Sequence, residues 1–97
     1  MRGTIMDYPL TLSTILEHAG RLHGDQEIVS RRPDTSIERY KFADFYKRSK
    51  QLSEALIKIG LNSGDRVATL CWNHAEHLEM YFGVPCAGGV IHTLNLR

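Results

Sequence analysis

The sequence lacks the features that mark several large classes of protein. With two cysteines, Cys71 and Cys86, it has no disulfide framework, and reduced, buried thiols are expected. Acidic and basic residues are interspersed and leave a net charge of +1, so nothing indicates a nucleic-acid partner. No apolar run approaches the roughly 18–20 residues that cross a bilayer, and no signal peptide is expected at the N-terminus. These absences favour a soluble, cytoplasmic protein without a transmembrane segment.

The common phosphate-binding motifs are also missing. The pattern G-x-x-x-x-G-K-[ST] does not occur, and neither does G-x-G-x-x-G. The pair Gly88-Gly89 is followed by an expected strand, whereas a phosphate loop would open a helix. No residue is therefore predicted to be catalytic, cofactor-binding or metal-binding. With 97 residues, of which 42% are hydrophobic and 24% charged, the chain has the size and composition of one globular domain at most.

Hydrophobic periodicity predicts an α/β fold with an N-terminal helix, a hairpin and a βαβ unit. The expected elements are a helix over 12–22, strands over 27–31 and 36–40, a helix over 42–60, a strand over 67–71, a helix from 73 to about 86 and a strand over 90–94. Thr11 is the expected N-cap of the first helix, and Gly60 the C′ residue of the second. Pro85 should end or kink the third helix, because proline removes an amide donor.

The βαβ unit should hold two parallel strands joined by a right-handed crossover. Residues 67–71 are almost continuously apolar, as expected of a strand that is covered on both faces. The strand over 90–94 would need a further helix to cover it, so the architecture looks unfinished.

The stretch "CWNHAEHLEMY" raises the question of a metal or catalytic site. Cys71, His74, His77 and Cys86 offer ligand types that zinc accepts. Their spacing matches no common zinc pattern, and Cys86 lies roughly 18 Å along the helix from its start. One ion is therefore not expected to reach both ends. A catalytic Cys71 is disfavoured too, because burial in an apolar strand would raise the pKa of its thiol.

A structural interpretation of this stretch is preferred. Asn73 can act as the N-cap of the third helix, with Glu76 at N3 reaching back in a variant of the capping box. His74, Glu76, His77 and Glu79 would then form the solvated side of the first turns. His92, in the last strand, is kept as a reserve candidate, because ligands of open α/β sheets bind at strand ends. A structural role is the commoner one for such a histidine.

Six segments carry a resemblance to a known family. They are "MDYPLTLSTILEHAGRLHG" (6–24), "EIVSRRPD" (27–34), "RYKFADFYKRSKQLSEAL" (39–56), "GDRVATL" (64–70), "WNHAEHLEMYFGVP" (72–85) and "GGVIHTLNLR" (88–97). Together they resemble, in order, the N-terminal region of adenylate-forming (AMP-binding) acyl-CoA synthetases, and in particular bacterial medium- and long-chain fatty acid–CoA ligases. Lys41 departs from the family pattern, in which Thr or Ser usually caps the helix; the missing cap costs about 1 kcal/mol.

The resemblance implies a parent enzyme that joins a fatty acid to CoA with ATP and Mg²⁺, through an acyl-adenylate. The family's phosphate-binding loop, adenine-binding segments and catalytic lysine have no counterpart in residues 1–97. The resemblance therefore implies that 1–97 is an incomplete N-terminal part of the large lobe, inactive by itself. Its partners would be the remainder of the ligase and, as in related enzymes, a second copy in a homodimer. The alternative is a stand-alone α/β interaction module without catalysis.

Overall fold

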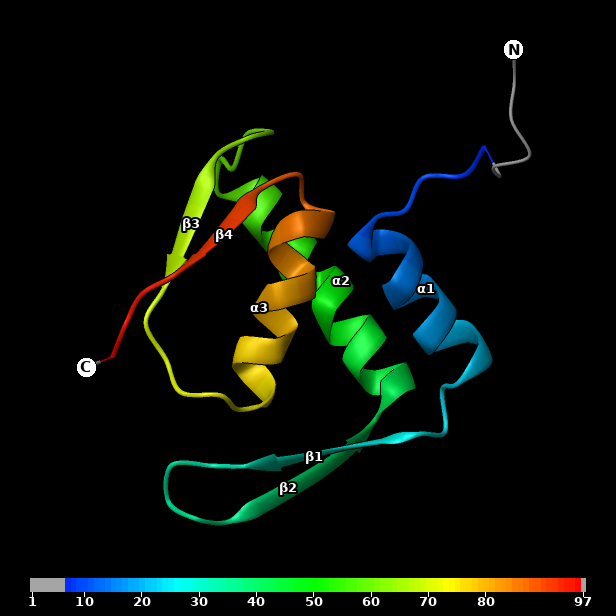
Figure 1. The fold of residues 1–97 in the computed structure, drawn as a ribbon, viewed down its shortest axis with the longest axis vertical. Helices are drawn as coiled ribbons and strands as arrows, with labels where there is room; N and C mark the ends of the chain where they lie inside the picture. Colours follow the sequence, from blue (N-terminus) through cyan, green and yellow to red (C-terminus); the bar gives the residue numbers. More distant parts are fainter. Residues whose placement is uncertain (1–6, 97) are drawn as a thin grey trace.

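The computed structural model describes residues 7–96 as three packed helices with a two-stranded sheet at either end (Figure 1). The elements are α1 (Leu12–Leu22), β1 (Glu27–Arg31), β2 (Ile37–Lys41), α2 (Phe42–Lys58), β3 (Arg66–Thr69), α3 (Ala75–Cys86) and β4 (Val90–Thr93). The expected α/β class and order of elements are confirmed. Within this range no helix is long and apolar enough to span a bilayer. The prediction about a signal peptide falls partly on residues outside the range.

The three helices form the core, with α2 between α1 and α3 (Figure 1). Leu16 of α1 and Phe45 of α2 are buried, since each lies on the apolar stripe of its helix, and Val84 of α3 is buried as well. Small residues bring α2 and α3 close together. A Cβ atom on Gly83 would lie 2.7 Å from the Leu52 side chain. Ser53 donates a hydrogen bond of 2.5 Å from its hydroxyl to the carbonyl of Gly83.

The long helix ends as its sequence predicts. Gly60 has φ +112°, a value that favours glycine, and its amide donates to the carbonyl of Ile57. The amide of Leu61 donates to the carbonyl of Leu56, which completes a Schellman motif. At the other end Lys41 is the N-cap and makes no side-chain capping bond.

The hairpin is confirmed, with β1 and β2 antiparallel and Val29 opposite Arg39. Its turn depends on Asp34, whose Oδ1 atom accepts hydrogen bonds from the amide of Ser36 at 3.0 Å and from its hydroxyl at 2.6 Å. This is the local backbone bonding expected of an aspartate in a turn. Thr35 takes a left-handed conformation, with φ +71°.

The βαβ unit is confirmed, because β3 and β4 are parallel, with Val67 opposite Ile91. The expectation that its first strand is covered on both faces is wrong for the described residues. β3 ends at Thr69, and Leu70, beyond it, is 66% exposed. Only one face of this small sheet packs against α3, so residues that point the other way stay in contact with solvent. Parallel sheets are usually covered on both faces.

Candidate functional site at the start of helix α3

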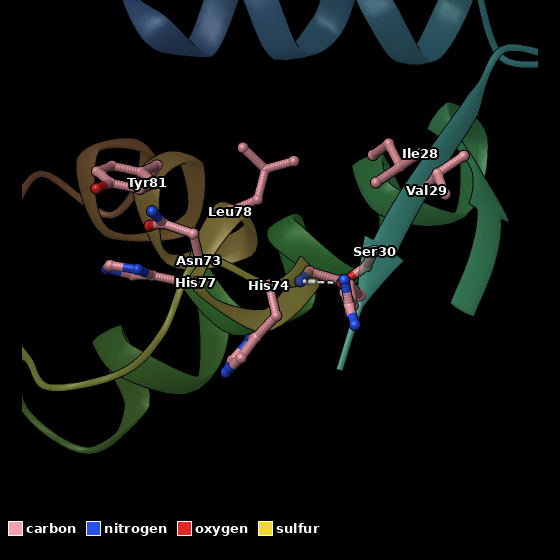
Figure 2. A pocket seen from close by; sticks show the side chains of 10 residues that line it. Ile28, Val29, Ser30, Asn73, His74, His77, Leu78 and Tyr81 are labelled. Atoms are coloured by element: carbon pink, nitrogen blue, oxygen red, sulfur yellow. Dashed lines mark hydrogen bonds between the residues drawn. The ribbon is translucent and has the colours of Figure 1, made fainter. Parts of the chain in front are cut away.

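The third helix begins one residue later than its sequence predicts. His74, not Asn73, is the N-cap, and the first intrahelical bond runs from the amide of Leu78 to the carbonyl of His74. Glu76 therefore stands at N2, so the predicted capping box is wrong. The cause lies outside the helix: the Ser30 hydroxyl of β1 accepts a hydrogen bond of 2.8 Å from the amide of Ala75 (Figure 2). A strand 45 residues earlier in the sequence thus supplies the bond expected from a local cap.

Glu76 connects the hairpin to this helix start. Its Oε1 atom lies 2.9 Å from Nη2 of Arg32, and its Oε2 atom lies 2.9 Å from Nδ1 of His74. Arg32 also pairs with Glu38 of β2, so one guanidinium bridges β2 and α3. Partial burial raises the pKa of Glu76, but its own backbone amide and Arg32 outweigh this effect and leave the pKa below its usual value. The carboxylate thus stays ionised at neutral pH.

His77 and Glu79 were expected on a solvated face, and both are buried, at 5% and 7% exposure. Nε2 of His77 lies 3.0 Å from the hydroxyl oxygen of Thr69, and its ring stacks on Tyr81 with centroids 4.7 Å apart. The prediction failed because α3 is enclosed from several sides, by α1 and α2, by β4 and by the hairpin, and Thr69 of β3 contacts His77. Only contacts between elements reveal this burial.

Glu79 is the charged group buried most deeply in this junction. Its Oε1 atom accepts a hydrogen bond of 2.7 Å from Nε of Arg48 and one of 3.2 Å from the Tyr40 hydroxyl. Burial, and then the charge of Glu79, raise the pKa of Tyr40 far above its usual value, so the phenol remains a donor. The hydrogen bond to Glu79 likewise raises the pKa of Arg48. Both carboxylates of α3 are therefore neutralised by arginines from other elements.

A cavity of about 320 Å³ lies between β1 and the start of α3 (Figure 2). Ile28 and Leu78 contribute apolar surface to its wall, and Ser30, Asn73 and His77 contribute polar groups. Ser30 already accepts the amide of Ala75, and His77 already contacts Thr69. Ser30 and Nε2 of His77 are thus engaged in structural bonds, whereas Nδ1 of His77 has no hydrogen-bond partner among the described residues.

The structure gives no geometric support to a metal or thiol site. Among residues 7–96, no three His, Cys, Asp or Glu side chains are grouped so that they could hold an ion. Cys71 lies in the loop after β3, not within the predicted strand, and burial raises the pKa of its thiol. Cys71 and Cys86 are both free thiols. His92, the reserve candidate, is exposed on β4 opposite Ala68.

The fold and this junction define an α/β unit, in which charged and polar groups join the elements to one another. Comparisons with known proteins then give the family. Residues 16–97 match the family described as AMP-binding enzyme. The chain is 46% identical over 95 residues to the long-chain-fatty-acid–CoA ligase of Thermus thermophilus, an alignment that covers 98% of this chain and 18% of the ligase. It is 40% identical over 97 residues to the medium-chain-fatty-acid–CoA ligase of Ectopseudomonas oleovorans, with coverage of 100% and 18%.

Solved structures show the same fold. The anthranilate CoA ligase AuaEII in complex with anthranoyl-AMP aligns with a TM-score of 0.78 and 24% identity, over 93% of this chain and 17% of the ligase. A fatty acyl-adenylate ligase from L. pneumophila aligns with a TM-score of 0.75 and 18% identity, over 87% and 15%. The chain belongs to the AMP-binding enzyme family, and it spans about a fifth of the length of the curated relatives that it matches.

Proposed function

We propose that residues 1–97 are the first part of the large N-terminal lobe of a fatty acid–CoA ligase, and that they act there as scaffold. The observation that carries the proposal is the 46% identity to a long-chain-fatty-acid–CoA ligase across 98% of this chain. A medium-chain ligase matches over the full chain as well. The alternative of a stand-alone interaction module gains no support from these relatives, because they are ligases.

The complete ligase would act in two steps. The fatty acid carboxylate attacks the α-phosphate of ATP, which forms an acyl-adenylate and releases pyrophosphate. The CoA thiol then attacks the acyl carbonyl, which forms the thioester and releases AMP. Mg²⁺, when bound, would neutralise phosphate charge. Residues 7–96 do not fit ATP or Mg²⁺, because they hold no phosphate loop, and the carboxylates of Glu76 and Glu79 are committed to Arg32 and Arg48. Other parts of the ligase would bind these groups.

The exposed face of the β3–β4 sheet supports the scaffold role. Val90 of β4 is 51% exposed, and Leu70 and Leu94, which directly follow β3 and β4, are 66% and 44% exposed. Parallel sheets are usually covered on both faces, and exposed apolar side chains beside such a sheet favour contact with another layer. We propose that the remainder of the ligase covers this face.

Two further parts of the proposal concern assembly and location. On α1, Ile15 and Leu22 are 55% and 70% exposed, which gives a second copy of the ligase an apolar surface on which to form a homodimer. The free thiols of Cys71 and Cys86 are consistent with the reducing environment of the cytoplasm.

The proposal is tested with three protein samples: the ligase encoded by the complete gene, the same ligase without residues 1–97, and residues 1–97 alone. ATP–pyrophosphate exchange that depends on a fatty acid is expected from the complete ligase and from neither piece. Fatty acid-dependent exchange by residues 1–97 alone would refute the scaffold role. A complete gene that ends at codon 97, with a product that binds a separate protein, would establish the interaction module instead.

A further inference from the structure

We draw no further inference here: the strongest candidate, the cavity between β1 and the first turn of α3, where Nδ1 of the buried His77 has no hydrogen-bond partner among the described residues, carries none because nothing in the structure shows what covers it.

Discussion

Removing Arg48 should destabilise the fold, because it leaves the carboxylate of Glu79 buried without its cation. In Arg48→Met the aliphatic stem is largely kept, while the bond of 2.7 Å from Nε to Oε1 of Glu79 is lost. Breaking a fully buried pair in this way costs about 3–5 kcal/mol. Here the Arg48 side chain is 56% exposed and that of Glu79 is 9% exposed, so water reaches one partner. We therefore expect a loss of about 1–3 kcal/mol in the free energy of unfolding.

The assay is equilibrium unfolding in urea, followed by circular dichroism. A matched control is Arg39→Met, which breaks the pair of Arg39 and Glu27, whose side chains are 62% and 54% exposed. Exposed pairs contribute about 0–1 kcal/mol, so the control should change stability little. A thermal scan gives a second readout, since 1 kcal/mol corresponds to about 4–8 °C in a domain of this size.

A double-mutant cycle isolates the charge that Arg48 compensates. In Glu79→Gln the neutral amide can still accept from the Tyr40 hydroxyl, and no buried charge remains when Arg48 is replaced. Arg48→Met should then cost less when it is combined with Glu79→Gln than in the natural protein, by about 1–2 kcal/mol of coupling. If Arg48→Met proves as mild as Arg39→Met, or equally costly with and without the Glu79 carboxylate, the reasoning about this buried pair is wrong.

Three other predictions follow from the junction and from the end of α2. Ser30→Ala should lower the free energy of unfolding by about 1 kcal/mol, because the amide of Ala75 loses its acceptor. Ser30→Thr keeps the hydroxyl and should cost less. Equal urea midpoints for the two variants would contradict the role of the Ser30 hydroxyl. Gly60→Ala should lower the free energy of unfolding by about 1–2 kcal/mol, because alanine is strained at φ +112°. The added Cβ meets no atom within 4 Å, so the cost comes from the backbone alone. An unchanged urea midpoint would contradict this strain. The pKa of the Glu76 carboxyl is lower in the folded protein than in the unfolded chain. The ionised carboxylate therefore stabilises the fold above its unfolded pKa, and this stabilisation is lost as the pH falls through its folded pKa. Stability measured against pH should therefore decline below about pH 4.5, less steeply in Glu76→Gln, and parallel pH profiles would refute the assignment.

Local signals were sufficient for the elements themselves. The periodicity of 42–60 predicted α2, and Gly60 was predicted as its C′ residue, because both depend on residues adjacent in the sequence. The turn at Asp34 was predictable for the same reason. The parallel pairing of β3 and β4 followed from the general rules of βαβ units.

The junction around α3 could not be predicted from local patterns. Asn73 looked like the better N-cap because it belongs to a favoured residue type, yet Ser30 of a distant strand decides where the helix begins. His77 and Glu79 looked like solvent-facing residues because they are polar, yet they are buried by neighbours that are remote in the sequence. Burial of a carboxylate becomes predictable only when the position of a partner such as Arg48 is known.

The hydrogen bond between Ser30 and Ala75 also has a consequence for the order of folding. The two residues are 45 positions apart, so forming this contact requires closure of a long loop, which slows folding relative to local contacts. Synthesis proceeds from the N-terminus, and domains generally fold in that direction as they emerge. The β1–β2 hairpin is therefore synthesised before the first turn of α3, and Ser30 leaves the ribosome before the Ala75 amide that donates to it.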